Sequence, residues 1–521
     1  MSDDATTVHE LIEWQAAVRP EAVYALATEA PDRRITFGEL ARHCRRVAAW
    51  LQAQGVPDGG TVSLVMPNGL QTLRLLLGAM HAGRCVNPVN LLSQPEQMRY
   101  VIDHSDCALV VVAPEWEARV RALLAKLGRS VALAVADPDA LLLSGEDALP
   151  LPAEPALAGV NVVPRPAQPA LLMYTSGTTG QPKGVMLSQA NLAANARAVG
   201  IEHGLGPGDR VLGVLPLYHI NAFAVTMLAP LAHGGSVAMA PKFSAARFWD
   251  QAHSSGCTWI NVVPTIISYL LEGEAPAREA LARIRFCRSA SAALPPEHLR
   301  AFEQKFGIGI IETMGLTETV APAFSNPLEA ARRKLGAVGR ASGCEAAVVT
   351  TGDAALQPVP DGTTGEIVIR GPNVMLGYYK NEAATRASFT PDGWLRTGDL
   401  GHRDADGFFF VTGRIKELII KGGENIAPRE IDEALLQHPL VLEAAAVGMP
   451  DKHYGQEILA CVVLREGAPP VAEAEASLRD FCTERLGRYK TPRVFRFVSE
   501  LPRGPSGKVQ RLKLLAATAG G

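Results

Sequence analysis

Short apolar runs that alternate with helical stretches are the feature that most constrains the fold of this chain. Residues 61–66 and 108–113 are rich in branched aliphatic side chains and are bounded by Gly, Asp or Pro, which is typical of buried strands. Residues 96–102 and 116–127 have the composition and spacing of helices. Buried strands that alternate with helices predict an α/β fold with largely parallel sheets.

The stretch from residue 211 to 241 carries no charged residue and is long enough to cross a bilayer. It is interrupted, so we expect a buried core or pocket wall and no membrane span. The interrupting residues are Pro216, Pro230, Gly234, Gly235, His219 and Asn221. The N-terminus is acidic and lacks the apolar segment of a secretory signal. Eight scattered cysteines without a CxxC pair favour a reduced, cytoplasmic setting.

The charge balance limits the partners of this chain. Fifty Lys and Arg against 53 Asp and Glu give a net charge of −3, which argues against a general nucleic-acid binder. Any phosphate site must therefore depend on a few placed cations and on backbone amides.

A compositional change after residue 410 predicts a second domain. Residues 418–420 form a strand candidate, Gly422 and Gly423 a turn, and Pro428 the first turn of an amphipathic helix. Further strand candidates at 462–464 and 494–498 surround a helix at 472–485. We therefore expect an N-terminal domain over residues 1–413 and a compact C-terminal domain over residues 414–521.

The densest chemical signal is the Gly- and Thr-rich segment from residue 174 to 185. Its glycines permit a tight backbone, its hydroxyls add donors, and Lys183 adds a mobile positive charge, which suits a loop around a polyphosphate. The spacing is not that of a Walker loop. Gly and Thr alone would fit a polar surface hairpin equally well.

The segment Thr-Ser-Gly-Thr-Thr-Gly-Gln-Pro-Lys-Gly at 175–184 resembles the phosphate loop of the acyl-activating, adenylate-forming superfamily. Acyl- and aryl-CoA synthetases, firefly luciferase and the adenylation domains of peptide synthetases belong to it. The resemblance extends in order over residues 215–219, 315–319, 393–399, 413–417 and 502–508. It implies an α/β fold with a large N-terminal lobe of mixed sheets flanked by helices and a small mobile α+β C-terminal domain.

The same resemblance implies an ATP-dependent carboxylic acid:CoA ligase that uses Mg²⁺ and proceeds through an acyl-adenylate. Alternatives are a stand-alone enzyme that loads an acyl carrier protein, a luciferase-like oxygenase and an inactive nucleotide-binding regulator. The implied partners are a small carboxylic acid and CoA, or a carrier protein in place of CoA, and a homodimer stays open. The matching motif residues argue against the regulator, because Lys183, Glu318, Asp399, Arg414 and Lys508 are all present.

Resemblance also assigns the nucleotide site. Lys508 would stabilise the charge that develops during adenylation, and Glu318 would hold Mg²⁺ beside a hydrogen bond from Thr317. Asp399 would accept hydrogen bonds from the ribose, and Arg414 would contact ribose or phosphate. Many relatives stack Tyr or Trp on the adenine where this chain has Met314. The nucleotide-binding set is completed by Thr175, Ser176, Gly177, Thr178, Thr179, Lys183 and Thr313.

Resemblance assigns the acid and thiol sites as well. Lys416 would be the hinge of the C-terminal domain, and Gly422 and Gly423 would let a pantetheine arm pass close to the backbone. His219 would lie beside the reacting carboxylate. No buried Arg or Lys is evident in the acid pocket, which predicts a fatty or other apolar acid, with a carnitine-type or aryl acid as the alternative. The pocket set is His219, Ile220, Asn221, Phe223, Val263, Pro264, Ile267, Ala290 within the loop 289–293, and Thr313.

Overall fold

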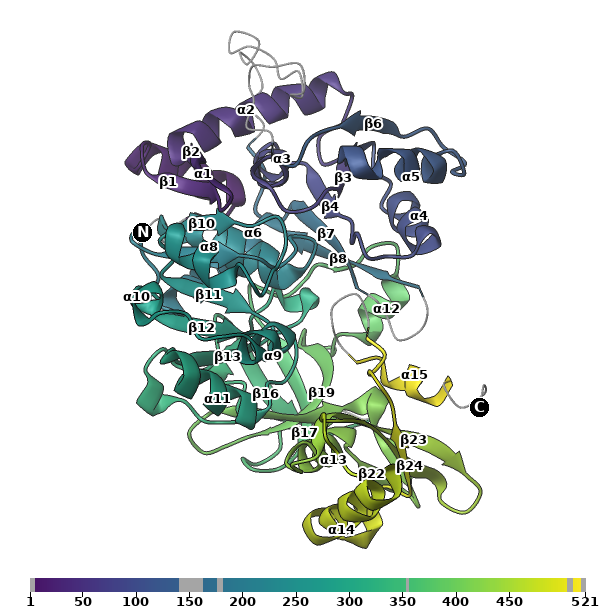
Figure 1. The fold of residues 1–521 in the computed structure, drawn as a ribbon. Helices are drawn as coiled ribbons and strands as arrows, with labels where there is room; N and C mark the ends of the chain where they lie inside the picture. The colour runs from purple at the N-terminus through teal and green to yellow at the C-terminus, as the bar shows by residue number, and fades with distance from the viewer. Residues whose placement is uncertain (1–4, 140–162, 176–180, 353–355, 504–508, 517–521) are drawn as a thin grey trace.

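The computed structural model describes residues 5–139, 163–175, 181–352, 356–503 and 509–516 (Figure 1). Within these residues the strands form four sheets, two large ones in the N-terminal part, a smaller one after them and one near the C-terminus. Helices and sheets alternate along most of the chain, and the mixed α/β architecture predicted from the sequence is confirmed.

The largest sheet has nine strands among the described residues, and its central strands run parallel. The antiparallel pairs lie at the two ends of the sheet, β1 with β2 at one end and β14 with β13 and β15 at the other. In spatial order the strands are β15 (Arg340–Ala341), β14 (Phe324–Ser325), β13 (Ile310–Met314), β12 (Phe286–Ser289), β11 (Trp259–Val262), β9 (Arg210–Gly213), β10 (Ser236–Met239), β1 (Val23–Ala27) and β2 (Ala30–Thr36).

A seven-stranded sheet contains the two strands that the apolar runs predict, now β3 and β5, which pair parallel to each other. Its edge is the antiparallel hairpin of β7 and β8, to which the short strand β18 adds. In spatial order the strands are β18 (Gly377–Tyr378), β8 (Lys183–Ser188), β7 (Pro169–Thr175), β4 (Cys85–Pro88), β3 (Thr61–Val65), β5 (Leu109–Val112) and β6 (Ala132–Val135).

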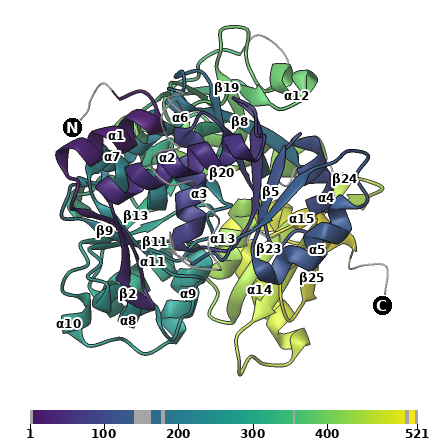
Figure 2. The same cartoon turned by 90° about the horizontal axis from the view of Figure 1, so that it is seen from above.

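Helix α3 (Leu70–His81) lies between the two large sheets, where it contacts β1 on one side and β4 on the other. All of its residues are buried, which explains its Leu-rich sequence on every face. Helices α1 and α2 pack against it, as the view from above shows (Figure 2). The other helices of the N-terminal part are α1 (Val8–Val18), α2 (Phe37–Ala53), α4 (Pro95–His104), α5 (Pro114–Leu124), α6 (Gln189–Glu202), α7 (Ala229–His233), α8 (Phe248–Ser254), α9 (Pro264–Glu272), α10 (Arg278–Leu281), α11 (Pro296–Phe306) and α12 (Glu382–Ala387).

The uncharged stretch from residue 211 to 241 forms β9, the π-helix η2 (Asn221–Leu228), α7 and β10, and nearly all of it is buried. The prediction of a core or pocket wall is therefore confirmed. None of the described helices is both long and apolar enough to span a bilayer.

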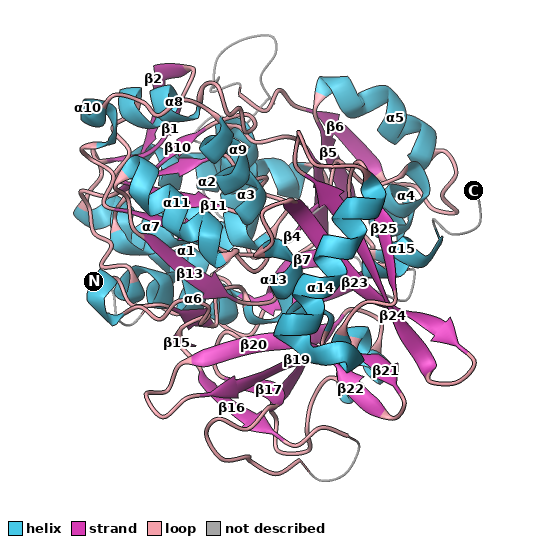
Figure 3. Ribbon diagram, turned by 60° about the horizontal axis from the view of Figure 1, so that its bottom comes forward, coloured by secondary structure: helices cyan, strands magenta, loops and turns pink. Residues whose placement is uncertain are grey.

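The C-terminal part has an antiparallel sheet of β16 (Glu345–Val349), β17 (Gly365–Arg370), β19 (Leu395–Arg403) and β20 (Phe409–Arg414). After it comes a smaller unit, brought forward in Figure 3, in which α13 packs on the sheet and on α14. The predicted glycine turn and the helix that begins at Pro428 are both present. The unit comprises β21 (Ile419–Lys421), β22 (Glu424–Ile426), α13 (Pro428–Leu436), β23 (Val441–Asp451), β24 (Gly455–Leu464), α14 (Val471–Lys490), β25 (Val494–Phe497) and α15 (Arg511–Ala516).

Candidate active site

The hairpin of β7 and β8 flanks the predicted phosphate loop, because Thr175 and Lys183 are cross-strand partners at its end. Ser176, Gly177, Thr178 and Thr179 lie outside the described residues. Lys183 places its Nζ 4.8 Å from the centre of the Tyr378 ring, a cation–π contact across β8 and β18. The cation of the loop is therefore held against a neighbouring strand.

Tyr378 also reaches the predicted metal ligand. Its hydroxyl donates to Glu318 Oε1 at 2.8 Å, so one side chain joins the positive charge of Lys183 to the carboxylate of Glu318. Among the described residues, Tyr378 makes the one side-chain hydrogen bond to this carboxylate. A half-buried carboxylate with acceptor capacity left over suits a hard cation such as Mg²⁺.

The turn that carries Thr317 and Glu318 is the short 3₁₀ helix η3 (Thr317–Thr319). Thr319 Oγ1 accepts from the Leu316 N–H at 3.0 Å, and the Asn373 side chain donates to the Thr319 carbonyl at 3.1 Å. Gly315 precedes the turn, and a Cβ there would lie 2.7 Å from Ala321 Cα. The family motif thus has a packing reason for its glycine.

Asp399 and Arg414 face each other across strands β19 and β20. Arg414 Nε donates to Asp399 Oδ1 at 2.7 Å, while the Asp399 side chain is only 4% exposed and that of Arg414 42%. The Asp399 charge, and more weakly the Glu417 and Glu318 carboxylates, raise the pKa of Arg414 against the effect of burial. The predicted ribose and phosphate residues are therefore one ion pair, in the electrostatic range of Glu318.

Two residues that support the segment leading to Asp399 were missed from the sequence, namely Arg396 and Glu366. Arg396 donates twice to Glu366 Oε2, at 2.7 and 3.0 Å, and the Gly398 N–H donates to Glu366 Oε1 at 3.1 Å. Glu366 is buried in β17 and so anchors the segment that presents Asp399. A carboxylate inside the apolar run 365–369 is the sequence signal that could have revealed it.

Strand β13 ends at Thr313 and Met314, two residues of the predicted nucleotide set, and Thr313 also belongs to the predicted acid pocket. Thr313 is buried and its hydroxyl lies 3.5 Å from the Ser289 carbonyl, whereas Met314 is partly exposed. Just before them, burial raises the pKa of Glu312 to about 7, and Arg429 on α13 opposes the shift. The carboxyl group of Glu312 in the nine-stranded sheet therefore interacts electrostatically with Arg429 of the C-terminal unit.

The residues of the predicted acid pocket follow the carboxyl ends of neighbouring inner strands of the nine-stranded sheet. β9, β11, β12 and β13 are neighbours, and the segments after their carboxyl ends carry the predicted side chains. His219 lies in the turn before η2, Asn221 and Phe223 are buried in η2, and Val263, Ile267 and Ala290 follow β11 and β12. A π-helix is rare in proteins and is often found at functional sites.

Contrary to the expectation from the sequence, a buried cation contacts a residue of the predicted pocket. Arg288 on β12 is fully buried, and its Nη1 donates to Asn221 Oδ1 at 2.5 Å and to Asn261 Oδ1 at 2.8 Å. The prediction of an apolar acid rested on the absence of such a group and loses that ground. Arg288 was overlooked because a single Arg in the segment 286–293 resembles a strand-end surface charge; its place in an internal strand was the available signal.

The hinge candidate Lys416 is exposed in the 3₁₀ turn η5 (Ile415–Glu417). Its neighbour Glu417 accepts from Arg511 Nε at 3.2 Å, and Arg511 Nη2 donates to Asp432 Oδ2 at 2.5 Å. Lys508, the predicted catalytic lysine, lies outside the described residues. Arg511 nevertheless ties the segment that follows it to η5 and to α13.

The turn between β21 and β22 has the backbone that the glycine pair predicts. Gly422 and Gly423 have φ values of +56° and +87°, and both are exposed. The preceding Lys421 is buried, with its Nζ 2.9 Å from both Glu457 Oε2 and the Tyr489 carbonyl. This ion pair fixes one side of the turn.

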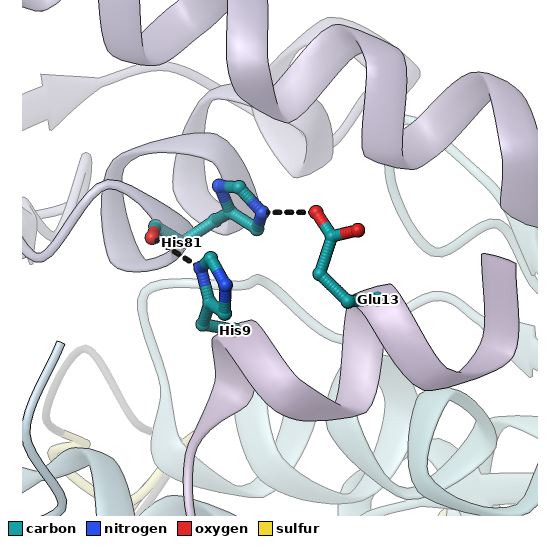
Figure 4. Close-up of side chains that lie close together, drawn as sticks. All are labelled: His9, Glu13 and His81. Carbon is teal, nitrogen blue, oxygen red and sulfur yellow. Dashed lines mark hydrogen bonds and ion pairs between the residues drawn. The ribbon is translucent and has the colours of Figure 1, made fainter. Parts of the chain in front are cut away.

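A His–Glu–His cluster lies apart from these residues, between α1 and α3 (Figure 4). His81 Nε2 and Glu13 Oε1 are 2.7 Å apart, and His9 Nδ1 lies 3.0 Å from the His81 carbonyl. Glu13 also pairs with Arg45 at 2.5 Å, and these contacts lower its pKa to about 2. His81 Nδ1 is buried and has no hydrogen-bond partner among the described residues, while its Nε2 and its carbonyl join α3 to α1.

Two family models match the chain: "AMP-binding enzyme" over residues 12–379 and "AMP-binding enzyme C-terminal domain" over residues 430–508. The sulfoacetate–CoA ligase of Cupriavidus necator is 58% identical over 98% of this chain and 97% of its own length. The oxalate–CoA ligase of Arabidopsis thaliana is 34% identical over 93% of this chain and 96% of its own. The ATP-bound structure of MatB from Rhodopseudomonas palustris superposes with a TM-score of 0.88 at 30% identity, over 98% and 99% of the two chains.

Proposed function

The chain belongs to the AMP-binding enzyme family and is an AMP-forming acid–CoA ligase, and from this premise we propose that its acid is small and carries a second polar or anionic group. Sulfoacetate is the first acid to test, because the sulfoacetate–CoA ligase of Cupriavidus necator is 58% identical over nearly the whole chain. The buried Arg288 supports a polar acid over the fatty acid that the sequence alone suggested.

The observation that carries the nucleotide assignment is the convergence of the Asp399–Arg414 pair with Glu318 and Lys183. In the proposed first step, a carboxylate oxygen of the acid attacks the α-phosphorus of ATP, and the bond to the bridging oxygen breaks to release pyrophosphate. Asp399 accepts hydrogen bonds from the ribose hydroxyls, and Arg414 and Lys183 face phosphate oxygens. Lys508 stabilises the negative charge that develops on the departing pyrophosphate. Glu318, with Thr317, would hold the Mg²⁺ that accompanies ATP and neutralises its phosphates.

In the proposed second step, the CoA sulfur attacks the acyl carbon, and AMP leaves with the electrons of the carbon–oxygen bond. The motion between the steps is assigned to a boundary after residue 413, with Lys416 as hinge. The positive φ values and exposure of Gly422 and Gly423 support a close approach of the pantetheine arm. CoA is the favoured acceptor because the sulfoacetate and oxalate relatives are both CoA ligases.

The test is acid-dependent AMP release by the purified protein with ATP, Mg²⁺ and CoA, with the thioester identified by mass. We expect sulfoacetate to be used with a higher kcat/KM than propionate or hexanoate. Pyrophosphate exchange without CoA isolates the first step, and a phosphopantetheinylated carrier protein in place of CoA tests the other acceptor. Preference for hexanoate would overturn the acid assignment, and transfer to the carrier protein alone would overturn the acceptor.

A further inference from the structure

Arg288 is a buried cation to which the described residues offer no counter-charge. Its side chain is fully buried in the middle of the nine-stranded sheet, and no described carboxylate lies within ion-pair distance. Its hydrogen-bond partners Asn221 and Asn261 are neutral amides. A buried charge without a charged partner is strongly unfavourable, so a protein that retains one has an unusual reason to do so.

The guanidinium also keeps donors in reserve. The hydrogen bonds to Asn221 and Asn261 both use Nη1, whereas Nε and Nη2 are buried and have no hydrogen-bond partner among the described residues. The nearby His203 adds no second positive charge, since burial and Arg288 lower its pKa to about 3. The adjacent Nε and Nη2 donors match two oxygens of one carboxylate or sulfonate.

Polar side chains connect this arginine to the acid side of the site. Asn221, which belongs to the predicted acid pocket, accepts from Arg288 and directs its own amide toward Ser291 Oγ at 3.4 Å. Ser291 is half-buried, and the next residues, Ala292 and Ala293, are exposed. The loop after β12 therefore leads through polar groups from the surface to the buried charge, among pocket residues that are otherwise mainly apolar.

We propose that Arg288 binds the second anionic group of the acid substrate and so selects short acids that carry a carboxylate or sulfonate at the far end. This inference rests on the proposed ligase function and adds the residue that sets its substrate class. Asn221 and Asn261 are positioning residues that hold Nη1, which leaves the Nε–Nη2 edge for the anion. The bound anion completes a charge pair that the polypeptide leaves incomplete.

The first experiment compares wild type with Arg288→Met for sulfoacetate and for propionate, in which a methyl group takes the place of the sulfonate. The ratio of the two kcat/KM values measures recognition of the distal anion. We expect Arg288→Met to lower this ratio on the order of 10²–10³-fold, because a site built for a polar group discriminates strongly. Arg288→Lys should recover part of the ratio, since it restores the charge without the two-pronged geometry.

A second variant keeps the proposal testable if Arg288→Met does not fold. Asn261→Asp has nearly the same shape and places a carboxylate where Arg288 Nη1 already donates at 2.8 Å. If Arg288 binds the distal anion, this internal counter-charge should lower the sulfoacetate-to-propionate ratio about tenfold or more while the melting temperature holds or rises. A purely structural arginine would give a stable Asn261→Asp variant with the wild-type ratio, and that result would overturn the proposal.

The wild-type measurements separate this inference from the ligase assignment. Wild-type protein that forms no CoA thioester with any acid would overturn the proposed function. Wild-type protein that makes thioesters but prefers propionate to sulfoacetate and to short dicarboxylic acids would overturn the role of Arg288 and leave the ligase function standing. A ratio that falls in Arg288→Met and in Asn261→Asp supports both.

Discussion

The predicted nucleotide side and the predicted acid side of the site each contain an arginine, Arg414 and Arg288, but the charges of the two arginines are balanced differently. Arg414 is paired with buried Asp399, which raises its pKa, and it reaches the surface. Arg288 is fully buried beside two amides, and burial lowers its pKa to about 9. One arginine is neutralised by the protein before any ligand arrives, and the other is not.

This difference matches what each side must do. In the proposed reaction every turnover uses the same nucleotide, so a fixed ion pair would hold in place the carboxylate that is assigned to the ribose. The acid is what distinguishes one ligase of this family from another, and a charge without a counter-charge selects the ligand that provides it. Changes on the nucleotide side should therefore slow all acids equally, and changes beside Arg288 should alter the preference among acids.

Lys508→Ala should produce the largest effect and should lower the adenylation rate to the same extent with every acid. We expect adenylation to fall on the order of 10²–10³-fold, as for the loss of one preorganised charge contact. Thioester formation from pre-made acyl-adenylate should be spared, because pyrophosphate has already left. Pyrophosphate exchange and single-turnover thioester formation measure the two steps, and equal losses in both would contradict the assignment.

Asp399→Asn breaks the ion pair of the nucleotide side without changing its shape. Arg414 would lose its counter-charge and the ribose its charged acceptor, so KM for ATP should rise on the order of tenfold to a hundredfold. The sulfoacetate-to-propionate ratio should stay at the wild-type value. A change in that ratio would show that the two sides are not independent.

Glu318→Gln tests the hard-cation ligand with a smaller change. A neutral amide is a poorer ligand for Mg²⁺, so the Mg²⁺ concentration for half-maximal adenylation should rise roughly tenfold. The Tyr378 hydroxyl can still donate to the amide oxygen, which preserves the local contact. An unchanged Mg²⁺ titration would make Glu318 a structural partner of Tyr378.

Glu312 provides the mildest test, through stability. Its pKa is about 7 in the folded protein and about 4.5 when unfolded, so the folded state binds the proton more tightly. The stability from this group is present below pH 4.5 and is lost as pH rises through 7, by up to about 3 kcal/mol. Glu312→Gln should therefore gain stability relative to wild type at pH 8 compared with pH 5. Denaturant unfolding at both pH values measures this, and parallel curves would contradict the shift.

The sequence predicted the parts of this molecule that follow from local patterns. The strands around residues 61–66 and 108–113, the glycine turn at 422–423 and the helix at Pro428 depend on apolar runs and backbone freedom that nearby residues determine. The order of motifs also indicated the family, which in turn indicated the candidate site residues.

Long-range polar pairing could not be predicted in this way. Glu366 gains its role only because Arg396 and Gly398 arrive from the neighbouring strand. Arg288 became significant only when strand order placed it beside Asn261 and next to the π-helix that carries Asn221. Neither partnership leaves a spacing in the sequence, because the partners come from separate elements.

The contacts of Arg511 have a consequence for stoichiometry. They tie the chain just beyond Lys508 to Glu417 and to Asp432. These three segments would therefore move as one in any rotation about Lys416. In the proposed mechanism, a molecule whose C-terminal unit has turned to admit the thiol would thereby have withdrawn Lys508 from ATP, and it would not begin a second activation until the first acyl group has left. Without CoA, each chain should release one pyrophosphate promptly and then pause, so that the size of this burst counts the working sites in a preparation.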